Sequence, residues 1–249
     1  MAGILEVCVD SLASARAAIA GGADRLELCS GLPIGGLTPY IALLRQIREE
    51  SAIPIRCLMR PRAGDFLYTD DEIRLMAAQI VALREAGADG FVIGCLTPAG
   101  DLDTAAMASL LEAAEGAPVT LHRCIDVSRD PVQTYLKAGV LGIDTVLTSG
   151  AAANCRLGME TIGRMLQLRD SCRGPEVLIG AGVNAAAITA FREILPQARA
   201  FHMSGKTEVK SGMVFRWEGV AMGLPGMDEW HIHQTSETAI RAARLALDA

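Results

Sequence analysis

Two arginines and an aspartate, Arg60, Arg62 and Asp65, follow a short apolar run at residues 53–59. The run has a proline near its start and the composition of a buried strand, so the charged residues would lie where that strand ends. Guanidinium groups bind carboxylate and phosphate oxygens through paired, charge-assisted hydrogen bonds. Arg60 and Arg62 therefore predict a binding site for an anionic ligand.

A third arginine and several small residues follow later expected strands and extend the predicted anion site. Arg123 adds another guanidinium group. Backbone amides in short, glycine-containing loops can hold a phosphate, as they do near the last two strands of many barrels. The residues of this kind are Ser149, Gly150, Gly182 and Ser204.

Three titratable side chains also fall at or just after expected strand ends: His122, Asp126 and His202. Histidine and aspartate at such positions can move protons to or from a bound substrate. We interpret the three as acid or base candidates. The alternative is that they are hydrogen-bonded structural residues.

Cys8 and Cys29 belong to two Glu-x-Cys segments in the first two expected strands. A pair of thiolates suits Cu(I), a soft ion, and the same pair could instead be a redox couple or ordinary packing. His231 and His233 are a weaker metal candidate. Two histidines in an irregular segment are more often surface residues without partners.

The elements that would position these side chains alternate along the chain. Runs typical of strands occur at residues 4–9, 25–29, 53–59, 90–94, 118–122, 144–148, 176–180 and 200–203. A helical pattern follows each run, and apolar residues recur most clearly at helical spacing in residues 70–86. Eight such strand–helix pairs predict a TIM (β/α)8 barrel, with an open doubly wound sheet as the alternative.

Two kinds of signal indicate where helices start and stop. Thr69 and Glu72 have the spacing of a capping box, which predicts a helix that begins at residue 70. Gly22, Gly87 and Gly142 each end a helical pattern and stand two residues before an aspartate. Glycine at such a position is the expected left-handed cap.

Alternation along each strand predicts which side chains face the barrel interior. The side that packs against helices must be apolar, so Glu6, Glu27, Arg25 and Arg56 point inward. Branched apolar side chains normally fill a barrel, so this polar set, together with Asp65, indicates a site. Alternatively, the four inward charges only neutralise one another.

The composition argues against some classes of partner. The net charge is −6 and no basic run is concentrated enough for nucleic acid. No apolar run approaches the roughly 18 to 20 residues that cross a bilayer, and the N-terminus leads into a strand without signal-peptide features. The seven cysteines lack disulfide spacing. We therefore expect a reduced, cytoplasmic protein without membrane contact.

We expect a single domain over residues 1–249, since an apolar content of 51% suffices for a large core. The strand–helix pattern fails between about residues 204 and 235. A long loop is expected there, and loops of this length are usually functional or part of an interface. A closing helix follows at residues 236–247.

Several motifs together closely resemble the CutC copper-homeostasis family over nearly the whole chain. The most specific is Arg-Pro-Arg-Ala-Gly-Asp-Phe-Leu-Tyr at residues 60–68. The other matching segments are residues 5–8, 22–29, 35–39, 122–123, 147–150, 212–213 and 215–216.

The resemblance implies a TIM barrel, a cytoplasmic homo-oligomer with a dimer as the favoured state, and Cu(I) binding through cysteines. Cys8 and Cys29 match the family's motifs, so they inherit the role of copper ligands. We therefore predict a copper-homeostasis protein. The alternative is an enzyme of unknown reaction that binds a small phosphorylated or carboxylated metabolite at the C-terminal mouth of the barrel.

Overall fold

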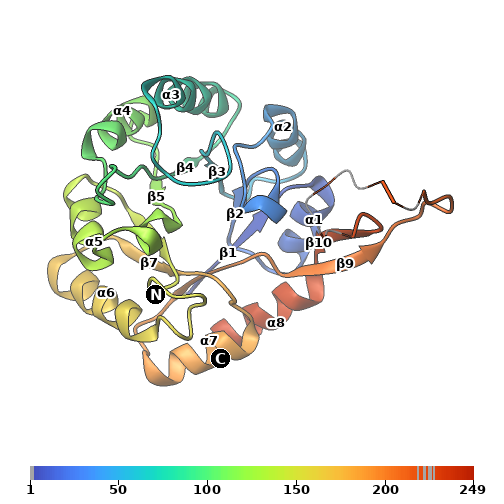
Figure 1. Cartoon of the computed structure of the whole chain (residues 1–249). Coiled ribbons are helices and arrows are strands. Elements are labelled where there is room, and N and C mark those ends of the chain that lie inside the picture. The colour runs from blue at the N-terminus through green and yellow to red at the C-terminus, as the bar shows by residue number, and fades with distance from the viewer. Residues whose placement is uncertain (1–2, 218, 221–222, 224–225, 227) are drawn as a thin grey trace.

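Eight parallel strands close into a barrel in the computed structural model, which describes residues 3–217, 219–220, 223, 226 and 228–249 (Figure 1). Neighbouring strands pair in chain order, and β1 closes the ring by pairing with β8. The strands are β1 (Ile4–Val9), β2 (Arg25–Leu28), β3 (Ile55–Leu58), β4 (Gly90–Ile93), β5 (Val119–Leu121), β6 (Thr145–Thr148), β7 (Glu176–Ile179) and β8 (Ala200–Met203). The predicted TIM barrel is therefore confirmed, and the open sheet is excluded.

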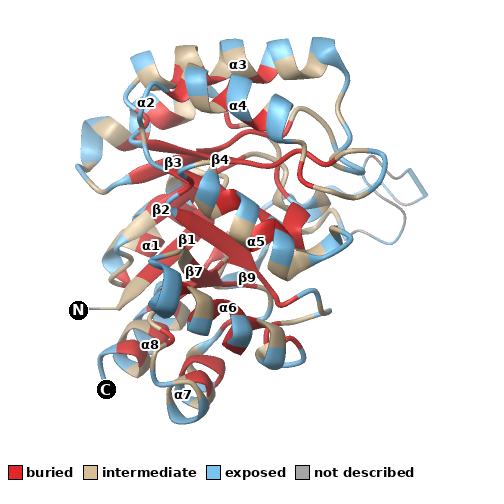
Figure 2. Ribbon diagram, turned by 90° about the vertical axis from the view of Figure 1, so that its left-hand side faces the viewer, coloured by how far each residue is buried: buried red, intermediate tan, exposed pale blue. Residues whose placement is uncertain are grey.

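The helices form an outer ring around the strands (Figure 1). They are α1 (Leu12–Ala20), α2 (Ile41–Glu50), α3 (Asp70–Glu85), α4 (Thr104–Ala114), α5 (Pro131–Val140), α6 (Met159–Cys172), α7 (Ala185–Ile194) and α8 (Glu237–Asp248). Figure 2 shows buried strands inside and exposed outer helix faces. Among the helices described, none is both long enough and apolar enough to cross a membrane.

The core lies between the helices and the outward side of the strands. Leu5, Val7 and Val9 are fully buried in this cluster, as alternation predicts for the helix-facing side of β1. Among the described residues, the inward side carries two small apolar clusters, one around Leu58 and one around Leu178. Polar side chains fill much of the remaining interior.

The sequence signals for helix ends are confirmed. Thr69 and Glu72 form a complete capping box at the start of α3, because each side chain accepts a hydrogen bond from the other residue's amide. Gly22, Gly87 and Gly142 have φ angles of 94°, 101° and 80°. Only glycine adopts this left-handed conformation without steric cost, so these residues turn the chain from helix to strand.

The aspartates after those glycines tie the strands together at their amino ends. Each accepts a hydrogen bond from an amide at the start of the preceding strand and also pairs with an arginine. The amide bonds are Leu5 to Asp24 (2.7 Å), Ile55 to Asp89 (2.7 Å) and Val119 to Asp144 (2.5 Å), and the arginines are Arg244, Arg48 and Arg56. These bonds set the register between successive strands.

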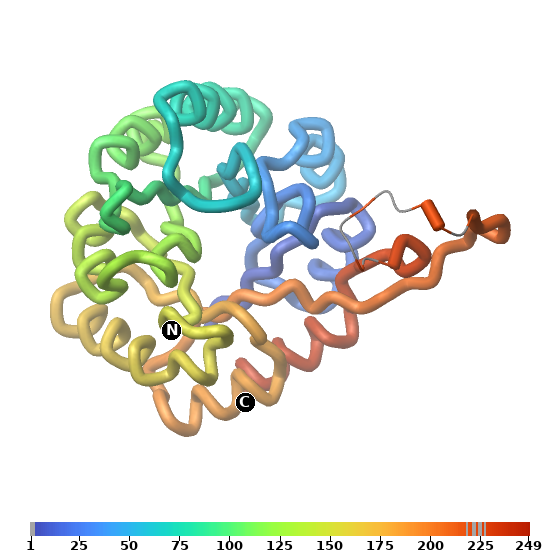
Figure 3. The backbone as a smooth tube through the Cα atoms, viewed as in Figure 1, coloured from blue at the N-terminus to red at the C-terminus, as the bar shows by residue number. Residues whose placement is uncertain are grey.

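The segment after β8 is not the continuous loop that the sequence suggested. It contains β9 (Lys206–Lys210) and β10 (His231–Thr235), which pair antiparallel and project beside the barrel (Figures 1 and 3). All five residues of β9 are exposed, so neither of its faces carries the apolar alternation that reveals a half-buried strand. The residue pattern therefore does not predict this hairpin.

Arg56 lies inside the barrel and should make Asp144 important for stability. Its guanidinium group donates to Asp144 at 2.7 Å and to Thr120 at 2.5 Å, and its side chain is 8% exposed. We expect Asp144→Ala to lower the free energy of unfolding by about 3 kcal/mol, because a buried charge loses its counter-ion.

Urea unfolding measures this effect. The matched control is Asp71→Ala, which removes a carboxylate that is 87% exposed and paired with a surface arginine. This control should cost less than about 1 kcal/mol. Equal costs for the two variants would contradict the role assigned to Asp144.

Candidate functional site

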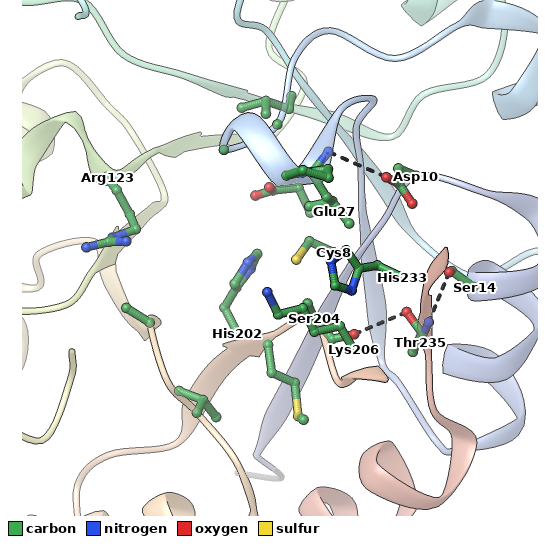
Figure 4. A pocket seen from close by; sticks show the side chains of 18 of the residues that line it. Cys8, Asp10, Ser14, Glu27, Arg123, His202, Ser204, Lys206, His233 and Thr235 are labelled. Atoms are coloured by element: carbon green, nitrogen blue, oxygen red, sulfur yellow. Dashed lines mark hydrogen bonds between the residues drawn. The ribbon is translucent and has the colours of Figure 1, made fainter. Parts of the chain in front are cut away.

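A cavity of about 910 Å³ opens at the carboxyl ends of the barrel strands, where TIM-barrel enzymes build their active sites. Cys8, Glu27 and His202 lie close together in it, and Arg123 lies across the space from them (Figure 4). Lys206 and His233 of the β9–β10 hairpin complete the wall beside Cys8 (Figure 4). The site therefore combines barrel residues with residues of the hairpin.

His122 follows β5 and presents a neutral imidazole to the cavity. Its Nδ1 accepts the amide of Cys124 at 3.1 Å, which places the ring proton on Nε2. Burial, followed by the charge of Arg60, lowers the pKa of His122 to about 3. Nε2 is buried and has no hydrogen-bond partner in the described part of the chain. His122 therefore keeps an unused hydrogen-bond donor, Nε2–H, on a side chain that lines the cavity.

Glu6, on β1, is a fully buried carboxylate held between two cations. It accepts from Arg25 Nε at 2.5 Å and from His202 Nδ1 at 2.8 Å. Although burial acts in the opposite direction, the charge of Arg25 and the bond from His202 lower the pKa of Glu6 to about 2. Burial likewise opposes protonation of His202, but Cys8, Glu27 and Glu6 raise its pKa well above the usual value. His202 is therefore an imidazolium whose Nδ1 proton is held by Glu6.

Glu27 is the second buried carboxylate, and it lines the cavity directly. It is 6% exposed, its Oε2 has no hydrogen-bond partner, and it has no ion-pair partner among the residues described. Burial raises the pKa of Glu27 to about 7, against the opposing charge of His202. Near neutral pH this carboxyl group can carry a proton, release it, or accept a cationic ligand.

The inward charges only partly neutralise one another. Glu6 pairs with Arg25, but Arg56 pairs with Asp144 and not with Glu27. One donor atom each from Glu6, Glu27 and His202 lies within 4.8 Å of the others. Among the described residues, Glu6, Glu27 and His202 are the group whose donor atoms are spaced closely enough to hold a metal ion.

The two candidate cysteines have different surroundings. Cys8 is 6% exposed and lines the cavity. Cys29 is fully buried against Leu58 and Val92. Its thiol donates to the carbonyl of Val9 at 3.5 Å, and burial raises its pKa well above the usual value. Cys29 is therefore an inert thiol in the present conformation.

Arg60 holds loops together, although it also lines the cavity. Its guanidinium group donates to the carbonyls of Ile34 (3.1 Å), Gly36 (3.0 Å) and Gly64 (3.0 Å). Only its Nε, which is buried, lacks a partner among the described residues. Arg60 therefore fixes the loops after β2 and β3 and retains little capacity for an anion.

Arg62 and Asp65 stabilise the loop after β3 and do not belong to the cavity wall. Arg62 donates to Glu72 at 2.6 Å, to Asp65 at 3.0 Å and to the carbonyl of Leu67 at 2.7 Å. The side chain of Asp65 is 70% exposed. Its assignment to the barrel interior was wrong, because the chain leaves the strand before Asp65 and alternation no longer applies.

Asp126 organises the loop after β6. It accepts from Thr148 Oγ1 at 2.6 Å, from the amides of Ser149 and Ala151 at 3.0 Å, and from Arg123 Nε at 2.7 Å. Its side chain is 5% exposed and does not line the cavity. The structure therefore favours a positioning role for Asp126.

The small residues of the predicted anion site divide into two groups. The amides of Ser149 and Gly150 are already bonded, to Asp126 and to Thr148 Oγ1 respectively. Gly182 and Ser204 do line the cavity, and Gly182 has a φ angle of 77°. Anion contacts are thus available from the loops after β7 and β8 and not from the loop after β6.

The hairpin brings residues to the site that the sequence analysis did not assign to it. Glu208 of β9 lines the cavity, and so does Asp10, which stands two positions after Cys8. Continued alternation from β1 could have indicated Asp10, whereas β9 gave no signal. His231 and His233 also line the cavity, and His231 is bonded to Asp228 at 2.6 Å rather than lacking a partner.

A closed (β/α)8 barrel with a polar cavity at the carboxyl ends of its strands defines the class of this protein. The profile of the CutC family matches residues 3–207, and the chain therefore belongs to the CutC family. The resemblance seen in the sequence motifs is confirmed.

Individual relatives agree with this assignment. A family protein CutC of Vibrio vulnificus is 37% identical over 245 residues, covering 98% of this chain and 97% of the relative. The copper homeostasis protein cutC homolog of Homo sapiens is 39% identical over 240 residues, covering 96% and 86%. The solved CutC structure from Streptococcus agalactiae has a TM-score of 0.75 at 26% identity and covers 81% of this chain and 98% of that one.

The neutral state of His122 should make stability depend on pH. Its pKa is about 3 in the folded protein and ordinarily 6.5. Between these values the unfolded chain binds the proton and the folded protein does not, so this contribution to stability is full above pH 6.5 and is lost as the pH falls towards 3. In His122→Asn, asparagine can still cap the Cys124 amide.

We therefore expect His122→Asn to lose less free energy of unfolding than the wild type when the pH falls through this range. Urea unfolding at several pH values measures the difference. If the two proteins lose stability in parallel, His122 is not held neutral in the folded state.

Proposed function

We propose that this chain is an enzyme that acts on a small anionic metabolite at the mouth of the barrel. The supporting observation is the buried Nε2–H of His122, a donor that has no partner among the described residues and belongs to a side chain that lines the cavity. An unused buried donor is costly unless a ligand accepts its proton. A neutral imidazole held in this way can polarise a carbonyl group of the substrate, as in known enolising enzymes.

Groups on the cavity wall suit the anionic part of such a substrate. Arg123 and Lys206 provide positive charge on opposite sides of the cavity, and Gly182 and Ser204 provide loop positions after β7 and β8. Arg60 would position the loops after β2 and β3, and Asp126 would position the loop after β6. His202 would carry a proton in the cavity.

Thermal-shift screening against phosphorylated and carboxylated metabolites at millimolar concentration tests this proposal. We expect at least one to raise the Tm. His122→Asn should weaken its binding about 5- to 10-fold, since one hydrogen bond contributes about 1 kcal/mol. Arg123→Ala should also weaken metabolite binding, because the ligand is expected to be an anion.

Arg74→Ala is the matched control, because its guanidinium group is 71% exposed on α3 and remote from the cavity wall. This variant should bind as the wild type does. The proposal fails if no metabolite raises the Tm, or if every hit is unchanged in both His122→Asn and Arg123→Ala.

The second candidate function is copper homeostasis through Cu(I) binding at Cys8 and Cys29. It is favoured by the name of the human relative, a copper homeostasis protein homolog, and by the position of Cys8 on the cavity wall. The pair fits Cu(I) poorly, because Cu(I) binding requires thiolates. The thiol of Cys29 is buried and donates to the carbonyl of Val9, and burial raises its pKa. We therefore place this candidate second.

A competition titration with a Cu(I) chelator under reducing conditions tests the copper candidate. If it is correct, the double variant Cys8→Ser, Cys29→Ser loses at least about 100-fold in Cu(I) affinity, since two soft ligands are removed. Cys172→Ser, which changes the exposed cysteine, is the control. Equal affinity in the wild type and the double variant removes the copper candidate.

We further propose that the chain acts in the cytoplasm as a single-domain homo-oligomer, with a dimer as the favoured state. The resemblance to the CutC family and the free state of all seven cysteines support this setting. Neither nucleic acid nor a membrane is a proposed partner, since the net charge is −6.

A further inference from the structure

A partly buried histidine and two buried glutamates meet at the cavity floor, on β1 and its neighbours β2 and β8. Glu6 belongs to β1, Glu27 to β2 and His202 to β8. One donor atom of each lies within 4.8 Å of the others. Figure 4 shows Glu27 and His202 directed towards the same space, with the sulfur of Cys8 beside them.

Glu6 and Glu27 have different roles at the cavity floor. Both oxygens of Glu6 are occupied, one by Arg25 at 2.5 Å and the other by His202 Nδ1 at 2.8 Å. A carboxylate that holds Nδ1–H leaves Nε2 of the ring as the ligand atom, and metal-binding histidines are commonly oriented in this way. Glu6 therefore acts as the positioning residue for His202.

Glu27 provides the charge that a cation would neutralise. It is 6% exposed, and neither an ion-pair partner nor a hydrogen-bond partner for Oε2 exists in the described part of the chain. A buried carboxylate without a direct ion-pair partner is destabilising, and it gains stability from a proton, from the nearby charge of His202 or from a bound cation. Asp10 and Glu208 line the same cavity and add negative charge to its wall.

We infer that the cavity floor binds a divalent cation of the zinc type through Glu27 and His202, with Cys8 as a third donor. The set of one oxygen, one nitrogen and one sulfur ligand suits Zn²⁺, whereas Cu(I) prefers sulfur and Mg²⁺ prefers oxygen alone. The sulfur of Cys8 lies beside Glu27 and His202 in Figure 4, although Cys8 is not one of the three residues whose donor atoms lie within 4.8 Å of one another. Three protein ligands leave one position open towards the cavity.

This inference deepens the proposed function and rests on it for its biological meaning. The open position of the cation would face the cavity that His122 lines, so a substrate oxygen could be polarised by the cation together with Nε2–H of His122. The inference shares Cys8 with the copper candidate and differs from it in the other ligands and in the metal.

The test uses the full chain, stripped of metal with a chelator and titrated with Zn²⁺ against a competing indicator. We expect one Zn²⁺ per chain. Glu27→Gln preserves the shape of the side chain but not its charge, and it should weaken binding at least about 100-fold. His202→Gln should have a similar effect, and Cys8→Ser a smaller one.

Substitution with Co²⁺ gives a second readout. A sulfur-to-metal absorption band should appear in the wild type and disappear in Cys8→Ser if the thiolate is a ligand. The double variant His231→Gln, His233→Gln is the matched control, because these imidazoles line the rim of the same cavity. It should keep the wild-type Zn²⁺ affinity.

Three results would overturn the inference: no saturable binding of Zn²⁺, unchanged affinity in Glu27→Gln, or loss of binding only in the rim-histidine variant. Circular dichroism of the metal-free variants checks folding, and Glu27→Asp provides a second variant if Glu27→Gln does not fold. Metabolite screening on the chelator-treated protein separates the two proposals. Metabolite binding that depends on His122 without any Zn²⁺ site would sustain the proposed function and remove the inference.

Discussion

The closure of the barrel depends on one buried carboxylate. Glu6 of β1 stands opposite Arg25 in the pairing with β2 and opposite His202 in the pairing with β8, and it is bonded to both. Each strand neighbour of β1 is therefore fixed by charge as well as by backbone pairing. Because Glu6 satisfies both cations, the interior can remain polar, and the same network leaves the buried Glu27 at the cavity wall without a direct ion-pair partner in the described residues.

Alternation along the strands was enough to predict the fold and the inward position of several site residues. Glu6, Glu27, His122 and His202 face the interior as expected, because strand parity depends only on the backbone and on the need to bury the outward side. Local sequence motifs likewise predicted the CutC family correctly. Which of these residues perform chemistry is a separate question that parity does not answer.

Alternation could not predict how the loop residues are used. Arg60 and Arg62 have the chemistry of anion ligands, but their partners are loop carbonyls and carboxylates whose positions depend on the loop path. Asp126 was a base candidate on the same reasoning and proves to be an acceptor for the loop after β6. The opposite error concerns β9, where the functional signal was missed because an exposed strand needs no apolar pattern.

The aspartate bonds at the amino ends of the strands have a consequence for the order of folding. They join residues 19, 34 and 25 positions apart, so each strand pair can be secured at a small cost in chain entropy. The bond between Glu6 and His202 spans 196 positions and requires the complete ring. We therefore expect the cavity floor to be the last part of the barrel to assemble. A partly folded chain would contain strand pairs joined by the aspartate bonds and would still lack the cluster of Glu6, Glu27 and His202.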